Sequence, residues 1–287
     1  MKLLDSKLEA FMAVAKHKTV HAAANVLSLT QTAVTQRIKL LEEKLGLSLF
    51  IRSRKGMELT GEGLALLRHS HLFQSLEDQA IKELQGLGLE TETELHIAAP
   101  TSIMSARVLP ACVPLIRRYP KLNFRFSVID EENRHFLLKQ SACDLAIVSA
   151  EHVAPEMSVK SLKPEYYVMV GPPAWEKRDI QELVKTEKII DFFPEDRQSF
   201  SYLKAKGLFD LANKSRHFVN NTELLAFMVS QGLGYSVLTT EFLSFVLDQH
   251  KLSVLNQEAS LENSVKLAWY ARPILSVYFQ AVLDALT

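Results

Sequence analysis

The sequence is poor in cysteine, which limits the ways its fold can be cross-linked. Cys112 and Cys143 are the only two cysteines in 287 residues, and they form no CxxC pair. A disulfide framework or a thiolate metal site would need more cysteines at short, regular spacing. We therefore interpret both side chains as buried free thiols in a reducing cytosol.

Uninterrupted apolar segments are also absent. No run of 18 uncharged apolar residues occurs in the chain, whereas a membrane-spanning helix needs about 20. Charged side chains interrupt the first eleven residues, which distinguishes them from the apolar segment of a signal peptide. The sequence therefore predicts a soluble, cytoplasmic protein that contacts no membrane.

Catalytic and cofactor-binding motifs are missing as well. The sequence contains no GxSxG, no HExxH and no Walker loop, and its nine histidines are scattered singly. Gly232-Leu-Gly234 lacks the third glycine of a dinucleotide-binding loop and is better interpreted as a turn. We therefore expect no catalytic residue, no metal and no cofactor.

The charge is unevenly distributed, although the whole chain has a net charge of zero. Residues 1–60 carry ten Lys and Arg against five Asp and Glu, so this part is +5 and the remainder is −5. A basic head on an acidic body indicates a polyanionic partner for the head alone.

Residues 1–60 show apolar residues at helical spacing, separated by short breaks. Thr19 can cap a short helix, and Thr30 can cap a third helix. The apolar residues of the third helix share one face, which we expect to be buried: Val34, Ile38, Leu41 and Leu45. The opposite face carries short polar side chains in its N-terminal turns, where a recognition helix meets base edges in the major groove.

Two short strand-like segments follow this helix and flank Arg54-Lys55-Gly56. We interpret them as a wing whose cations reach phosphates or the minor groove. Glu42 and Glu43 follow on the outer side of this helix. Because their carboxylates would repel phosphates, we expect that end of the helix to face away from DNA. The candidate DNA-binding residues are Thr30, Gln31, Thr32, Thr35, Gln36, Lys39, Arg52, Arg54 and Lys55.

The same residues carry a family resemblance. The strings AANVL at 23–27, TQTAVTQRI at 30–38, LFIR at 49–52 and LT at 59–60 resemble the DNA-binding domain of LysR-type transcriptional regulators. The resemblance implies base readout by Thr30, Gln31, Thr32, Thr35 and Gln36, with Arg52 as the wing arginine. Thr32 replaces a common Pro of the family and Gln36 a common Arg, so the preferred bases do not transfer.

A connector without proline follows from Thr60 to about residue 86. Its apolar residues recur at heptad spacing and predict a coiled-coil-like dimer seam: Leu66, Phe73, Leu76, Ala80, Leu84 and Leu87. The alternative is a helix that packs only on its own chain. The resemblance favours the seam, because LysR-type proteins dimerise through this helix. Gly86 and Gly88 then mark a hinge.

The last two hundred residues alternate between strand and helix patterns. The predicted strands are 94–99, 123–129, 144–148, 166–170, 235–238 and 266–270, and the predicted helices include 110–119, 132–140 and 221–231, with one more after Pro273. This alternation predicts parallel sheets with crossover helices. It resembles the effector domain of the same family.

Polar residues stand where these strands meet the following helices. Ligands in such sheets bind beyond the carboxyl ends of strands and near helix N-termini. Hydroxyl, amide and N–H donors there suit a small anionic or polar effector; the alternative for each is simple helix capping. The candidate effector-binding residues are Thr101, Ser102, Ser149, Asn220, Asn221 and Thr222.

The sequence thus predicts an N-terminal α-helical winged helix-turn-helix, a long linker helix, and an α/β two-lobed periplasmic-binding-protein-like (type 2) effector domain. We expect the boundaries at 1–60, 61–88 and 89–287, with one lobe formed by 89–165 plus 268–287 and the other by 166–267.

The predicted function is sequence-specific transcription regulation controlled by a small metabolite bound between the lobes. The expected partners are double-stranded DNA, that effector, RNA polymerase, and further copies of the chain in a homodimer or a dimer of dimers (tetramer). The alternatives are a ligand-independent DNA-binding regulator and an enzyme with a fused DNA-binding domain.

Overall fold

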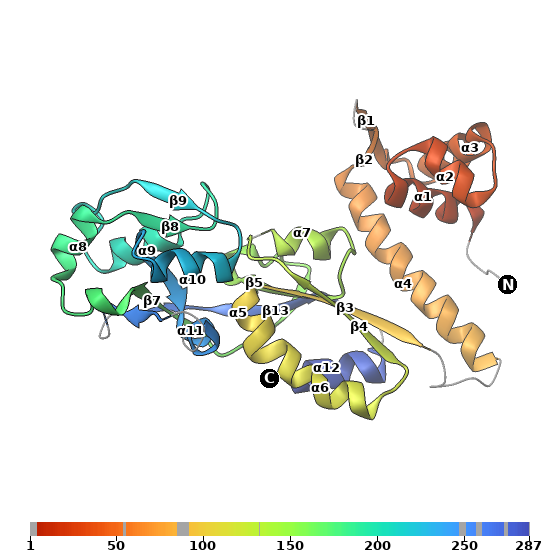
Figure 1. The fold of residues 1–287 in the computed structure, drawn as a ribbon. Helices are drawn as coiled ribbons and strands as arrows, with labels where there is room; N and C mark the ends of the chain where they lie inside the picture. The colour runs from red at the N-terminus through yellow and green to blue at the C-terminus, as the bar shows by residue number, and fades with distance from the viewer. Residues whose placement is uncertain are drawn as a thin grey trace.

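The computed structural model shows a small head, a long connecting helix and a two-lobed C-terminal part (Figure 1). The structure describes residues 5–53, 56–84, 92–131, 133–246, 251–256, 260–272 and 275–286. Within these residues, no helix is both long and apolar enough to cross a membrane.

The head consists of three helices and a two-stranded hairpin. Its elements are α1 (Ser6–His17), α2 (Val20–Leu27), α3 (Gln31–Leu45), β1 (Phe50–Ser53) and β2 (Gly56–Leu59). Thr19 and Thr30 cap α2 and α3, and each accepts a hydrogen bond from the N–H three residues later. The expected burial of Leu45 is wrong: this side chain is exposed, because α3 lies against the core only as far as Leu41.

The helix α4 (Gly61–Leu84) leaves the head and continues for 24 residues, or about 36 Å at 1.5 Å per residue. Thr60 begins it, accepting from the Gly63 N–H at 2.9 Å and donating to the Ser48 carbonyl at 2.8 Å. A side chain at Gly63 would place its Cβ 2.2 Å from the Leu49 carbonyl oxygen. The start of α4 is therefore packed tightly on the head.

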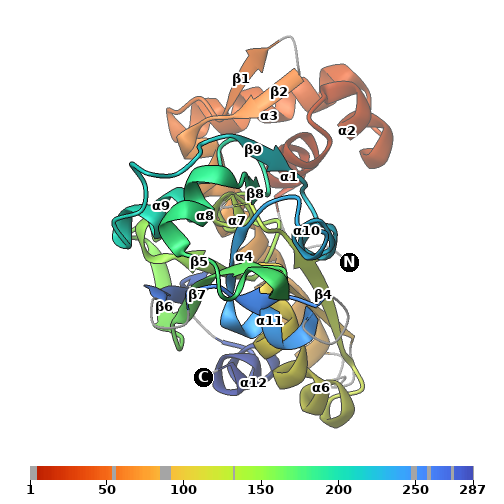
Figure 2. The same cartoon turned by 60° about the vertical axis from the view of Figure 1, so that its left-hand side comes forward.

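Lobe I contains one five-stranded sheet in the order β4-β3-β5-β13-β6. Its strands are β3 (Thr93–Ala99), β4 (Leu122–Val128), β5 (Leu145–Ser149), β6 (Met157–Ser161) and β13 (Val265–Tyr270). Its helices are α5 (Thr101–Ile103), the π-helix η2 (Met104–Val108), α6 (Leu109–Arg118), α7 (Arg134–Lys139), η3 (Ala150–His152) and α12 (Val277–Ala285). The helices α6 and α12 pack side by side (Figures 1 and 2).

Lobe II is built around β7 (Glu165–Gly171), which pairs with β10 (Ser236–Thr239), β11 (Ser253–Val254) and β12 (Leu261–Asn263). A smaller parallel pair consists of β8 (Ile189–Asp191) and β9 (Arg216–Phe218). The helices are η4 (Pro173–Trp175), α8 (Ile180–Thr186), α9 (Gln198–Ala205), α10 (Thr222–Ser230) and α11 (Thr240–Val246). Two apolar clusters, on α10 with α11 and on α8 with α9, bury the two faces of the β7 sheet.

The expectation of parallel sheets holds only in part. β3 pairs in parallel with β4 and β5, but β13 runs antiparallel to β5 and β6. All three neighbours of β7 are also antiparallel to it. The reason is that β7 and β13 follow the points where the chain crosses between lobes, so each enters a sheet whose other strands run the opposite way.

The chain crosses between the lobes twice. The first crossover lies between β6 and β7, and the second is Ser264, between β12 and β13. The return to lobe I therefore begins with β13 at Val265, three residues before the boundary we placed at 268. Two crossovers leave the lobes connected by a narrow hinge.

Candidate functional site

The outer face of α3 is available to a partner. Gln31, Thr32, Gln36 and Lys39 are exposed, and Thr35 is half-buried beside them. Thr30 is a capping residue, with its Oγ1 3.1 Å from the Ala33 nitrogen. The structure thus gathers these predicted residues on one surface, and most of their hydrogen-bonding groups face solvent.

His21 on α2 was not among the predicted residues, although it contacts this surface. Its Nδ1 lies 3.1 Å from Gln31 Nε2, and its Nε2 lies 3.3 Å from Asn25 Nδ2. The imidazole therefore holds the Gln31 amide at the first turn of α3. The i, i+4 spacing of His21 and Asn25 was the available signal, but nothing in the sequence shows that α2 delivers them to α3.

Glu42 has a different place from the one we expected. Its Oε1 accepts hydrogen bonds from the N–H groups of Leu49 at 2.7 Å and Phe50 at 3.4 Å. The expectation that Glu42 lies on the outer side is wrong, because its carboxylate turns inward to the first residues of β1. It joins α3 to the strand that carries the exposed Arg52.

The hairpin is also attached to the turn between α1 and α2. Met57 donates its N–H to the Lys18 carbonyl at 2.7 Å. Gly56 has φ +116°, and a Cβ there would lie 2.4 Å from the Lys18 carbonyl oxygen. Only glycine tolerates both conditions. Arg54 and Lys55, two predicted wing cations, lie outside the described residues.

The predicted seam runs along α4. Phe73 and Leu76 are 48% and 40% exposed, and Ala80 is exposed as well. Leu66 instead packs partly against the head core, and the side chain of Leu84 and all of Leu87 lie outside the described residues. The described outer seam therefore has apolar side chains that this chain leaves uncovered.

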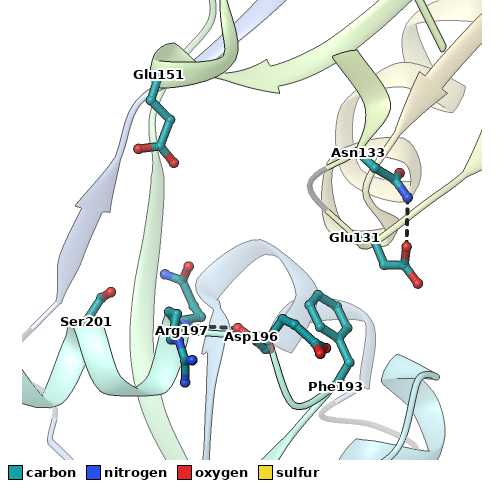
Figure 3. A pocket seen from close by; sticks show the side chains of 9 residues that line it. Glu131, Asn133, Glu151, Phe193, Asp196, Arg197 and Ser201 are labelled. Carbon is teal, nitrogen blue, oxygen red and sulfur yellow. Dashed lines mark hydrogen bonds between the residues drawn. The ribbon is translucent and has the colours of Figure 1, made fainter. Parts of the chain in front are cut away.

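A cavity of about 580 Å³ lies between the two lobes. Glu131, Asn133 and Glu151 line it from lobe I; Phe193, Glu195, Asp196, Arg197, Gln198 and Ser201 line it from lobe II. Figure 3 shows Glu131 and Glu151 across the cavity from Asp196, Arg197 and Ser201. Four carboxylates and one guanidinium give this lining a net charge of −3.

Asp130 links two of the predicted effector residues. Its carboxylate accepts the Thr101 N–H at 2.8 Å and the Thr101 hydroxyl at 2.9 Å. The hydroxyl of Thr222, at the start of α10 in lobe II, donates to the same carboxylate at 3.3 Å. The structure therefore brings Thr101 and Thr222 together, but around a carboxylate of the protein.

The other predicted effector residues are more dispersed. Ser102 donates to Glu165 at 2.7 Å, and Asn221 caps α10 by accepting the Leu224 N–H at 2.9 Å. Asn220 is exposed, and Ser149 ends β5. Asn221 thus fits the helix-capping alternative. Asp130 and the cavity carboxylates were missed, since acidic loop residues give no periodic signal.

The two cysteines are buried free thiols, as the sequence predicts. Burial raises the pKa of Cys112 to about 11 and that of Cys143 to about 12, so both are protonated thiols at neutral pH. In the part of the chain that the structure describes, no cluster of three His, Cys, Asp or Glu side chains could hold a metal ion.

Two family models match the chain. Residues 6–64 match "Bacterial regulatory helix-turn-helix protein, lysR family", and residues 89–287 match "LysR substrate binding domain". The matches cover the head with the start of α4, and both lobes.

Curated relatives agree with these models. The HTH-type transcriptional regulator DsdC of Escherichia coli (strain K12) is 31% identical over 173 residues, 60% of this chain and 54% of the relative. YofA of Bacillus subtilis (strain 168) is 31% identical over 46% of this chain and 45% of the relative. The chain thus spans about half the length of these two relatives. ArgP of Aeromonas salmonicida is 28% identical over 83% of this chain and 81% of the relative.

Solved structures show the same fold. ArgP from Mycobacterium tuberculosis superposes with a TM-score of 0.81 at 22% identity, over 99% of this chain and 96% of that one. Full-length LysG from Corynebacterium glutamicum, with bound effector Arg, superposes with a TM-score of 0.76 at 18% identity, over 98% of this chain and 95% of that one.

Proposed function

This chain belongs to the LysR family of bacterial regulatory proteins, and we propose on that premise that it regulates transcription by binding specific DNA sequences under the control of a small molecule. The observation that carries the proposal is the α3 surface. A capped helix presents exposed Gln and Thr side chains beside a hairpin that bears an exposed arginine. Such groups hydrogen-bond base edges in the major groove, while the hairpin arginine contacts phosphates.

We propose that the unit that binds DNA is a dimer joined through α4. Phe73, Leu76 and Ala80 supply the uncovered apolar seam. Two-fold symmetry would place two α3 helices at half-sites about one helical turn apart, or a multiple of it.

A second self-contact would extend this dimer to a dimer of dimers. On α6, Leu109, Val113 and Ile116 form an exposed apolar stripe, and on α10 Leu224 and Phe227 form another. Large exposed apolar patches mark interaction sites in soluble proteins. We propose that the effector domains associate through these two stripes.

The effector that suits this cavity carries positive charge. The cavity lining is net negative, and the N–H of Thr101 already donates to Asp130. We first expected a small anionic or polar effector, and an anionic one would meet four carboxylates in this lining. The similar LysG structure holds arginine. We therefore propose a small metabolite with an ammonium or guanidinium group.

The chain's own side chains favour a regulator over an enzyme. The cavity lacks a nucleophile paired with a base among its described lining residues, and the two thiols are protonated and buried. We propose a cytoplasmic protein with no enzymatic activity, and we keep RNA polymerase as a proposed partner at the promoter.

DNA titrations with the full chain test the proposal. Thr35→Ala and Gln36→Ala should each relax sequence preference, at about 1–3 kcal/mol per lost base contact. Arg52→Ala should weaken binding to all sequences and flatten the salt dependence. Gln181→Ala, at an exposed position of lobe II, is the control. Parent-like affinity and preference in all three head variants would show that the head does not bind DNA through α3 and β1.

A further inference from the structure

One arginine contacts both lobes and a crossover at the hinge. Arg107 lies in η2, a π-helical turn between α5 and α6. Single π-turns are rare and often occur at functional sites. The helix α11 of lobe II packs against α5 and η2 at this point, so Arg107 stands where the lobes meet.

The guanidinium of Arg107 joins three segments of the chain. Its Nε donates to both carboxylate oxygens of Glu241 on α11, at 3.0 and 2.9 Å. Its two terminal nitrogens donate to the carbonyl oxygens of Lys163 and Pro164, in the first crossover between β6 and β7. Arg107, Glu241 and these two carbonyls are called the hinge clamp below.

A second polar contact lies beside the hinge clamp. Glu165, the first residue of β7, is only 2% exposed, and Ser102 of lobe I donates to it at 2.7 Å. Glu165 also pairs with Asn263 of β12 in the sheet, next to the second crossover. The region around both crossovers is therefore tied to lobe I by directed hydrogen bonds.

We infer that Arg107 is a positioning residue that fixes the angle between the two lobes. A fork of N–H donors matches a carboxylate in one plane and at one distance. Rotation of lobe II about the crossovers moves Glu241 relative to the Lys163 and Pro164 carbonyls. The Arg107 side chain cannot then satisfy all its partners. The hinge clamp therefore stabilises one angle between the lobes. An effector that changes this angle must overcome that stabilisation, and one that favours the same angle adds to it.

The inference concerns the lobes themselves, so the test needs neither DNA nor effector. Spin labels at Lys139→Cys in lobe I and Gln181→Cys in lobe II, both exposed positions, report the distance between lobes by pulsed electron resonance. The native cysteines are buried thiols with raised pKa values and should label poorly. A sample without the two introduced cysteines measures that background.

The labelled chain is diluted into excess unlabelled parent, so that each assembly holds a single labelled copy. We then expect one narrow distance distribution for the parent. Arg107→Met and Glu241→Gln should each broaden it and add a second component. The double variant should resemble Arg107→Met, because that substitution alone already removes every contact of the hinge clamp. Arg107→Lys keeps the charge without the fork and should fall between parent and Arg107→Met.

Arg178→Met is the matched control, because it removes an ion pair of 2.7 Å with Glu187 that lies within lobe II. It should leave the distribution unchanged. Parent-like distributions in both Glu241→Gln and Arg107→Met would overturn the inference, and so would equal broadening by Arg178→Met. If Arg107→Met fails to fold, as circular dichroism would show, Glu241→Gln alone decides.

Discussion

Glu42→Ala should release the first strand of the hairpin from α3. The backbone N–H groups that donate to Glu42 belong to Leu49 and Phe50, residues that are 1% and 9% exposed, so water replaces the lost acceptor poorly. A hydrogen bond to a charged group contributes about 1.5–3 kcal/mol. The Phe50 bond at 3.4 Å is weak, so the two bonds together should contribute about 2 kcal/mol to the stability of the hairpin. The higher helix propensity of alanine offsets a small part of this loss.

Amide hydrogen exchange measures this loss locally, which matters because a chain of several domains need not unfold in one step. About 2 kcal/mol corresponds to roughly thirtyfold faster exchange at Leu49 in Glu42→Ala. Glu42→Gln keeps a neutral acceptor and should lose part of this protection. DNA affinity should fall for all sequences together, because β1 carries Arg52.

Glu43→Ala provides the control at the neighbouring position. Within the described part of the chain, the exposed Glu43 forms an ion pair with the exposed Lys39 at 3.6 Å, a contact of about 0.5 kcal/mol or less. Its removal should leave exchange at Leu49 unchanged. The reasoning is refuted if Leu49 keeps its parent exchange rate in Glu42→Ala, or if both variants accelerate it equally.

Three further predictions concern assembly, pH and the effector. Phe73→Glu should reduce the sedimenting mass of the full chain by placing a charge in the α4 seam; an unchanged mass would mean that the helix serves only its own chain. Burial raises the pKa of Glu165 above 4.5, so the folded state holds its proton more tightly, and stability should fall as pH rises from that value through the raised pKa. Glu165→Gln should flatten this dependence in denaturation curves measured as the pH rises above 4.5, and a parent-like slope would contradict it. Glu131→Gln, in the cavity lining, should weaken binding of a cationic amino acid such as arginine by about tenfold or more in calorimetry, and unaltered binding in the variant would remove Glu131 from the site.

The head could be predicted closely from the sequence because its signals are local. Thr19 and Thr30 were recognised as caps from residue type and position alone, and both accept the expected hydrogen bonds. The hairpin followed from two apolar segments around Gly56. Each of these features depends on residues only a few positions apart.

The contacts that position the candidate sites could not be predicted, since they join distant segments. Asp130 meets Thr222 across 92 positions, and Arg107 meets Glu241 across 134. Periodicity carries no information about such pairs. The antiparallel β13 was missed for the same reason, because its direction depends on a crossover that only the assembled lobes define.

Selection of duplexes from a random pool by the full chain tests the central claim most directly. If the α3 helices of a dimer read DNA, the enriched sequences should contain two half-sites related by a dyad, about one helical turn or a multiple apart. Gln36→Ala should select a changed base at one position of each half-site. Recovery of sequences without any shared pattern, or the same pattern from the variant, would contradict the assignment of α3 as the recognition helix.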